Sequence, residues 1–378
     1  MRAKLPTWPA VLIVSALLPA ALHGQTRQVP VDSARVAEDA VTIRGQHVPY
    51  RVTSGFQPVW SDSGKALASL FYIYYERTDV RDRSRRPLLI SFNGGPGTAS
   101  LWMHIGYTGP RTFSMDDEGY PVQPYGLREN PNSILDVTDI VYIDPVNTGF
   151  ARALPGVDAR QFFGVNEDVA YLARWLDAFV SRHQRWNSPK FLIGESYGTT
   201  RVSGLARRLQ DAHWLYLNGV ILDARYTGID RRTGGESYDY DPALTAWEHM
   251  FTPAINYYLR DVLGWKTDLQ YYVFGPTSPW VRTGDNTGTD LRLAMAENPF
   301  MRLLVQGGYY DGGTDYFSAK YTLWQLDPGG RLRDRMSFDP YRSGHMMYLR
   351  KQDAPVATER PRAFIRGAVP AEGSPAKY

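Results

Sequence analysis

The stretch of sequence that decides the fold is residues 190–198, KFLIGESYG, in which an apolar run ends at a glycine-flanked serine. The apolar run is typical of a buried strand, and residues 197–211 have the spacing of an amphipathic helix. Ser196 therefore lies in a sharp turn from strand to helix, which Gly194 and Gly198 allow without steric clash. Because such a turn projects the hydroxyl above the sheet, we expect Ser196 to be a nucleophile. The alternative is an ordinary loop serine.

Around this segment the chain alternates between apolar runs and helical patterns. The further apolar runs are 87–92, 139–143, 217–222 and 301–306, and the further helical patterns are 166–185 and 252–263. This alternation predicts an α/β fold, with a mostly parallel central sheet and helices on both of its faces. In such sheets ligands bind outside the carboxyl ends of the strands. Two earlier runs, 41–52 and 66–76, predict an antiparallel N-terminal β portion.

His345 is the histidine that we expect to activate Ser196, because a serine hydroxyl is a weak nucleophile until a base takes its proton. It follows a short strand-like segment late in the chain, and its place fits the order nucleophile, acid, histidine. Asp311 lies between the two, after a buried strand and a glycine pair, where it would orient the imidazole. Asp315 is the alternative acid, although it can also simply begin a helix over 316–326.

A glycine-rich loop at residues 93–97, NGGPG, follows the first of the parallel strands. Glycines let backbone N–H groups approach a negative charge that develops on an oxygen atom. Together with the N–H of Tyr197, directly after the nucleophile, this loop predicts an oxyanion hole.

These segments resemble the serine carboxypeptidases, peptidase family S10, whose members have an α/β-hydrolase fold. The matching segments are FNGGPGTAS (92–100), GPR (109–111), NPNSILDVTDIVYIDPVNTGFAR (130–152), NEDVAYL (166–172), GESYG (194–198) and SGHMMYL (343–349). The resemblance implies a serine-type carboxypeptidase that releases C-terminal residues from peptides through an acyl-enzyme. It also implies that Ser196, Asp311 and His345 form the catalytic triad.

The resemblance implies roles for five further residues. The N–H groups of Gly95 and Tyr197 match the oxyanion hole. Asn93, Gly94 and Glu195 match the group that hydrogen-bonds the free C-terminal carboxylate of the substrate. Glu195 can donate such a bond only when it is protonated, at acidic pH or with a raised pKa. The alternative role of Glu195 is to complement the dipole at the start of a helix.

The chain also departs from the pattern of this family. Many relatives have a second glutamate shortly after the glycine loop, and no acidic residue occurs between positions 93 and 109 here. Thr98 stands where many relatives have cysteine, which is consistent with a bacterial-type member. Members usually carry a long cap insertion after the strand that matches 217–222, and we expect this cap to be largely missing. The open alternatives are therefore an esterase or acyltransferase on the same scaffold, and an inactive relative without its cap.

Composition excludes several classes of function. The chain of 378 residues has 42 Lys and Arg against 39 Asp and Glu, so its formal net charge is only +3 and gives no sign of a nucleic-acid partner. It contains no cysteine, which excludes cysteine proteases, zinc–cysteine sites, iron–sulfur clusters and disulfides. We expect no metal and no cofactor, and the expected partners are peptides with a free C-terminus.

The N-terminal segment predicts export. Residues 1–24 have a basic start and an apolar run over 8–22, which is shorter than the roughly 20 residues that span a bilayer. We therefore expect a signal peptide and a secreted or periplasmic protein with no membrane span after leader removal; the alternative is an uncleaved anchor. Residues 25–366 are expected to form one α/β-hydrolase domain, and residues 367–378 a flexible tail.

Overall fold

The computed structural model describes residues 28–123, 126–225, 242–283, 286–371 and 373. The expected leader, residues 1–24, lies outside the described residues. Nowhere in the described part of the chain does a helix combine the length and the hydropathy needed to cross a bilayer.

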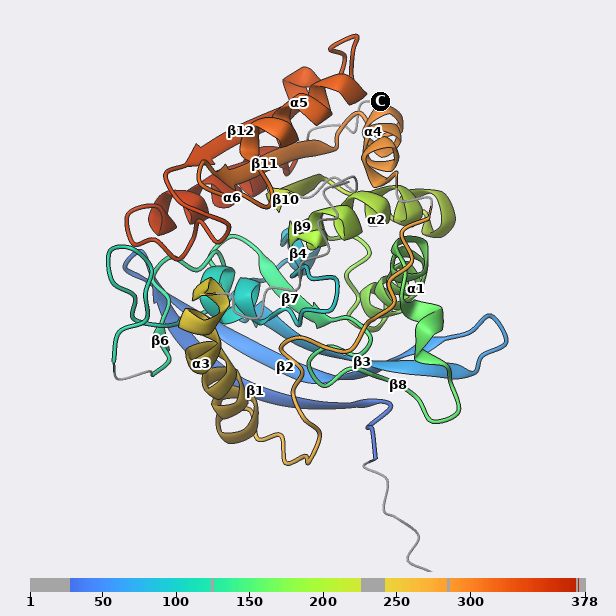
Figure 1. Cartoon of the computed structure of the whole chain (residues 1–378), viewed down its shortest axis with the longest axis vertical. Helices are drawn as coiled ribbons and strands as arrows, with labels where there is room; N and C mark the ends of the chain where they lie inside the picture. The colour runs from blue at the N-terminus through green and yellow to red at the C-terminus, as the bar shows by residue number, and fades with distance from the viewer. Residues whose placement is uncertain (1–27, 124–125, 226–241, 284–285, 372, 374–378) are drawn as a thin grey trace, which may run out of the picture.

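Among the described residues, ten strands form one mixed sheet at the centre of the molecule (Figure 1). Its order is β1-β2-β3-β7-β4-β9-β10-β11-β12, and β8 pairs with β3. The strands are β1 (Ser33–Ile43), β2 (Gln46–Trp60), β3 (Ala66–Arg77), β4 (Leu88–Phe92), β7 (Asp139–Asp144), β8 (Arg152–Ala153), β9 (Lys190–Ser196), β10 (Gly219–Arg225), β11 (Arg302–Gly308) and β12 (Met336–Tyr341). The part from β7 to β12 is parallel and the part from β1 to β3 is antiparallel, which confirms the predicted sheet. A separate pair joins β5 (Arg111–Thr112) and β6 (Arg128–Glu129).

The prediction of a single strand over 41–52 is wrong, because the chain reverses within it. Ile43 pairs with Gln46 across a two-residue turn. Both turn residues have positive φ, 50° at Arg44 and 80° at Gly45. Two positive φ angles are the geometry of a tight hairpin turn, in which glycine is favoured at the second position.

Helices cover both faces of the sheet. The α-helices are α1 (Val165–Arg182), α2 (Tyr197–His213), α3 (Pro242–Tyr257), α4 (Thr287–Glu297), α5 (Tyr316–Leu326) and α6 (Ala354–Ala368). Short helical turns are η1 (Arg83–Arg85), η2 (Trp102–Thr108), η3 (Ala159–Phe162), η4 (Tyr258–Val262) and η5 (Arg333–Arg335). The expected helices over 166–185, 197–211 and 316–326 correspond to α1, α2 and α5. The helix expected over 252–263 begins earlier and is α3 continued by η4.

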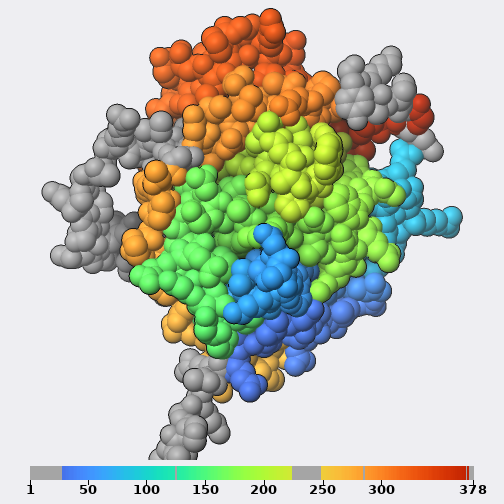
Figure 2. All heavy atoms as spheres, turned by 90° about the vertical axis from the view of Figure 1, so that its right-hand side faces the viewer, coloured from blue at the N-terminus to red at the C-terminus, as the bar shows by residue number. Residues whose placement is uncertain are grey.

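Two apolar cores lie on the two faces of the sheet. Phe191 and Ile193 of β9 belong to one core with buried side chains of α3, α6 and η2, whereas Leu192 belongs to the other core with α1, α2, α4 and α5. This alternation follows from the period of two along a strand that is buried on both faces. Figure 2 shows the second face, on which α1 (green) and α2 (yellow-green) lie beside each other below the C-terminal elements (orange).

Helix α3 and the turn η4, which come next after β10 among the described residues, pack on the antiparallel part of the sheet. Buried side chains of α3 and η4 join the core formed with β1, β2 and β3. The chain then returns along residues 271–281, which we call the strap. The N–H of Ala99 donates to the carbonyl of Val273 at 3.0 Å, and the N–H of Gly275 donates to the carbonyl of Gly97 at 2.7 Å. The strap therefore fixes one side of the glycine-rich loop. Residues 226–241, where the cap prediction begins, lie outside the described residues.

Candidate active site

Ser196 lies at the end of β9, at the sharp turn into α2. Its backbone has φ 58° and ψ −127°, a conformation that non-glycine residues rarely adopt. A Cβ on Gly194 would overlap the carbonyl of Gly198, and one on Gly198 would lie 3.0 Å from the carbonyl oxygen of Asn93. Both glycines are therefore needed for the backbone to pack at this turn. The local structure is the strand–turn–helix that the sequence predicts.

Asp311 and His345 meet on the loops that follow β11 and β12. The Nδ1 atom of His345 lies 2.8 Å from Oδ2 of Asp311. Oδ1 of Asp311 accepts the N–H groups of Gly313 at 3.0 Å and Thr314 at 2.9 Å, and the hydroxyl of Thr314 donates to Oδ2. These bonds fix the carboxylate in one orientation, which in turn fixes the imidazole.

The electrostatics of this pair favour a charged carboxylate. Burial alone would raise the pKa of Asp311, but the hydrogen bond and charge of His345 outweigh burial and lower it. Burial would likewise lower the pKa of His345, but the bond and charge of Asp311, together with the charge of Glu195, outweigh burial and raise it. The side chain of Asp311 is 3% exposed and that of His345 is 37% exposed, so the imidazole remains open to the solvent side.

Asp315, the alternative acid, occupies a different place. Its carboxylate accepts the N–H groups of Phe317 at 3.1 Å and Ser318 at 3.3 Å. It is the N-cap of α5, which is the structural role that the sequence left open for it.

The glycine-rich loop lies directly against the nucleophile. A Cβ on Gly94 would come within 2.7 Å of the backbone nitrogen of Tyr197 and 2.8 Å of the Cβ of Ser196. Gly95 has a φ of +100°, which favours glycine at this position. The structure thus brings the loop that contains Gly95 against Tyr197, as an oxyanion hole requires.

Glu195 is buried beside these residues, with 3% of its surface exposed. Its Oε2 atom accepts bonds from Nδ2 of Asn93 at 2.5 Å and from the hydroxyl of Tyr348 at 2.9 Å. Oδ1 of Asn93 accepts the N–H of Met103 at 3.1 Å, which fixes the amide. Burial is the largest cause that raises the pKa of Glu195, to about 7. The carboxyl therefore holds a proton over most of the acidic range.

A second buried carboxyl, that of Asp223, lies beside Glu195 on the neighbouring strand. The two residues are register partners in β10 and β9, so their side chains project to the same face. Oδ1 of Asp223 accepts a bond from Nε2 of Gln306 at 2.9 Å, and Oδ2 has no hydrogen-bond partner among the described residues. Burial, with a smaller contribution from Glu195, raises the pKa of Asp223 to about 8. Two buried carboxyls with raised pKa therefore lie on neighbouring strands of the sheet.

Asp223→Asn is expected to lessen the loss of stability that the protein undergoes as the pH rises. In the unfolded chain the carboxyl ionises near its ordinary pKa of 3.8, whereas the fold raises the pKa of Asp223 to about 8. Between these values ionisation increasingly favours the unfolded state, by about 1.4 kcal/mol per pH unit. We expect the Tm of the variant to match wild type near pH 4 and to exceed it by on the order of 5 °C at pH 8, measured by calorimetry. An equal difference in Tm at both pH values would contradict this.

Sequence reasoning missed Tyr348, Thr314 and Asp223 as members of this site. Tyr348 lies three residues after His345, and Asp223 directly follows an expected strand, where functional groups concentrate. Those positions were the available signals. The partners of Tyr348 and Asp223 could not be predicted, because their bonds to Glu195 and Gln306 join elements that are far apart in the sequence.

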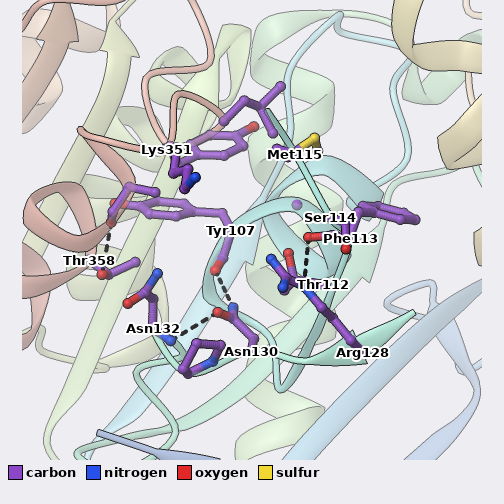
Figure 3. A pocket seen from close by; sticks show the side chains of 15 residues that line it. Tyr107, Thr112, Phe113, Ser114, Met115, Arg128, Asn130, Asn132, Lys351 and Thr358 are labelled. Atoms are coloured by element: carbon purple, nitrogen blue, oxygen red, sulfur yellow. Dashed lines mark hydrogen bonds between the residues drawn. The ribbon is translucent and has the colours of Figure 1, made fainter. Parts of the chain in front are cut away.

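A cavity of about 240 Å³ lies next to this site but outside it (Figure 3). Tyr107 and Tyr348 line it and stack on each other with ring centroids 4.4 Å apart. Arg128 and Lys351 also line it, from the β6 region and the segment before α6. None of the eight expected site residues, all of them within the described part of the chain, is in its lining. Only Tyr348 reaches from this cavity to Glu195.

Three features together define an α/β hydrolase. They are the mostly parallel sheet, the serine at positive φ between β9 and α2, and the Asp–His pair after β11 and β12. Among solved structures, KEX1(DELTA)P, a prohormone-processing carboxypeptidase from Saccharomyces cerevisiae, has a TM-score of 0.59 to this chain. It is 14% identical, and the match covers 85% of this chain and 92% of that one. At this identity the likeness shows the fold.

Comparison with known sequences supports the serine carboxypeptidase family for this chain. Residues 43–223 match the family model described as serine carboxypeptidase. Serine carboxypeptidase-like 8 of Arabidopsis thaliana is 23% identical over 265 residues, which are 60% of this chain and 59% of that protein. Serine carboxypeptidase-like 32 of the same species is 27% identical over 240 residues, which are 58% of this chain and 48% of that protein. This chain therefore matches between 48% and 59% of the length of these two relatives.

Proposed function

We propose that the protein is a serine carboxypeptidase that releases C-terminal residues from peptides. The observation that carries the proposal is the buried carboxyl of Glu195, next in sequence to Ser196 and hydrogen-bonded to Asn93. A serine hydrolase has no need of such a group for attack on a carbonyl. A hydrolase that recognises a free carboxylate does, because a protonated carboxyl and an amide can both donate to it.

In the proposed reaction Ser196 attacks the carbonyl carbon of the last peptide bond. His345 takes the hydroxyl proton and then gives it to the leaving amine. The 2.8 Å bond from Nδ1 of His345 to Asp311 supports this role, because it leaves the other ring nitrogen as the acceptor and stabilises the imidazolium. The N–H groups of Gly95 and Tyr197 hold the negative oxygen of the tetrahedral intermediate. Water then hydrolyses the acyl-enzyme by the same route.

Recognition of the substrate carboxylate depends on the proton of Glu195. Because the pKa of Glu195 is raised to about 7, the donor form dominates below neutral pH and is lost above it. Asn93 and Gly94 complete the proposed group. The expected affinity for peptides therefore falls as the pH rises through 7, while hydrolysis of substrates without a carboxylate does not depend on this proton.

The test compares a peptide with its C-terminal amide and wild type with Glu195→Gln. Wild type is expected to cleave the free peptide at least about 100-fold faster in kcat/KM, since a site built for hydrogen bonds discriminates strongly against a substrate without them. Above pH 7 the KM of wild type for the peptide is expected to rise about tenfold per pH unit. The Gln variant keeps an N–H donor at every pH, so its KM is expected to stay level between pH 6 and pH 8.

A simple ester without a carboxylate is the control substrate, and its KM should not follow the ionisation of Glu195. Equal cleavage of the peptide and the amide would refute the carboxypeptidase and favour an esterase or acyltransferase on this fold. A Gln variant whose KM rises above pH 7 as in wild type would remove Glu195 from the proposed role.

The proposal includes the setting of the enzyme. Residues 1–24 would act as an export leader and residues 25–366 as one catalytic domain with a shortened cap. The enzyme would then act on peptides as a secreted or periplasmic protein. The last helix, α6, ends at Ala368, two residues inside the segment 367–378 that we expect to be a tail.

A further inference from the structure

Arg201 forms a fully buried cluster beneath the glycine-rich loop. Its Nε atom donates to Oδ2 of Asp168 at 2.7 Å, and both side chains have no exposed surface. Its Nη1 atom donates to the backbone carbonyl of Asn93 at 2.6 Å, and its Nη2 atom to the carbonyl of Pro96 at 3.2 Å. The guanidinium thus holds the loop at two points, in the planar geometry that arginine offers.

These two points lie on either side of Gly95, whose N–H is one of the proposed oxyanion donors. The other donor is the N–H of Tyr197, the first residue of α2, and Arg201 lies one turn further along the same helix. The guanidinium also lies 5.2 Å from the ring centroid of Tyr197. A single side chain therefore connects the loop that contains the first donor to the helix that contains the second.

A gain in stability is a weak reason for such a cluster. Burying an ion pair costs several kcal/mol per ion, and apolar side chains of similar volume often replace such a pair without loss of stability. Arg201 lies on the apolar face of α2, four and eight residues before Leu205 and Leu209, where an apolar side chain would fit the pattern. Asp168 is held in turn by the hydroxyl of Tyr171 at 2.9 Å, which fixes the acid on α1.

We propose that Arg201 is a positioning residue that sets the distance between the two oxyanion donors. Its guanidinium fixes the loop on both sides of Gly95 relative to α2, and Asp168 fixes the guanidinium. The inference rests on the proposed serine hydrolase function. An error of about 1 Å in such a site can reduce the rate about 100-fold, so a rigid connection between the donors is of direct use in catalysis.

The chain contains a matched control at the opposite end of β4. Arg185 is also fully buried, and its Nη1 atom donates to Oδ2 of Asp139 at 2.6 Å. Its Nη2 atom donates to the backbone carbonyls of Arg86 at 2.7 Å and Pro87 at 3.3 Å, just before the strand. Each arginine thus joins a buried aspartate to two backbone carbonyls at one end of β4, Arg185 before the strand and Arg201 after it. Only Arg201 does so at the end that reaches the nucleophile.

The experiment compares Arg201→Lys with Arg185→Lys. A lysine keeps the charge but cannot make three bonds in one plane, so both variants are expected to lower Tm. For ester hydrolysis, Arg201→Lys is expected to lower kcat about 10- to 100-fold with KM within about threefold of wild type, because the donors act on the transition state. The rate of labelling by a fluorophosphonate should fall by a similar factor. Arg185→Lys is expected to keep kcat within about twofold when assayed below its Tm.

Equal kcat for the two lysine variants would overturn the proposal, since loss of packing alone would affect both. If Arg201→Lys does not fold, Asp168→Asn tests the same connection, because it retains the guanidinium and weakens its anchor. We then expect kcat to fall about 3- to 10-fold, and an unchanged kcat would overturn the proposal. A wild-type protein that is folded but inert would instead refute the hydrolase function itself, so the two failures are distinguishable.

Discussion

Replacing Ser196 by alanine is expected to lower kcat about 10⁶-fold and to abolish labelling by a fluorophosphonate. Its backbone at φ 58° places Ser196 at the end of β9, where a Cβ added to Gly94 of the glycine-rich loop would come within 2.8 Å of its own Cβ. Alanine keeps that Cβ and the same turn, so the fold is expected to persist. The measurements are hydrolysis of a peptide and an ester, with gel-based detection of the probe.

Ser237 offers a matched control, because residues 235–238 repeat the sequence Gly-Glu-Ser-Tyr that surrounds Ser196. This second segment lacks the closing glycine and lies outside the described residues. Ser237→Ala is expected to keep full labelling. If labelling survives in Ser196→Ala and disappears in Ser237→Ala, the nucleophile is Ser237 and not Ser196. A folded wild type that is never labelled would favour the inactive, cap-less relative.

Asp311→Asn is expected to lower kcat about 10⁴-fold, the second largest effect. The carboxylate accepts a bond from Nδ1 of His345, whereas an asparagine can present an N–H there and favour the opposite tautomer. Ring nitrogen Nε2 would then carry the proton and could not accept one from Ser196. The loss should appear in kcat for both ester and peptide, because each needs the same base.

The control for this variant is Asp315→Ala. Asp315 caps α5 through the N–H groups of Phe317 and Ser318, so its loss is expected to cost about 1 kcal/mol of stability and to leave kcat unchanged. The reverse result, with activity lost at position 315 and kept at position 311, would exchange the two assignments. Calorimetry on both variants separates a loss of folding from a loss of catalysis.

Most of the parallel half of the fold could be predicted because its strands, apart from β12, are short apolar runs followed by loops. The hairpin of β1 and β2 was missed because its turn, Arg44-Gly45, interrupts an alternating pattern for only two residues. Helix α6 was missed because Pro361 lies inside it, and proline ordinarily argues against a helix interior. Helix α4 buries few large apolar side chains and therefore gives a weak helical pattern.

The triad itself stays a prediction. Ser196 ends β9, Asp311 and His345 follow β11 and β12, and the structure brings the last two into contact. The pairing of Asp223 with Glu195, and of Arg201 with the carbonyl of Asn93, could not be predicted. Both depend on which strands are neighbours and on which helix face meets the loop, and neither is encoded by local spacing.

The strap limits how far the region after β10 can be shortened, by evolution or by an engineer. Its backbone bonds to Gly97 and Ala99 make it part of the wall that supports the glycine-rich loop. Residues before α3 can therefore differ in length between homologues with little effect on the chemistry, as long as the chain still returns along 271–281. A deletion that removed this return would release the loop from one of its supports, of which Arg201 is another.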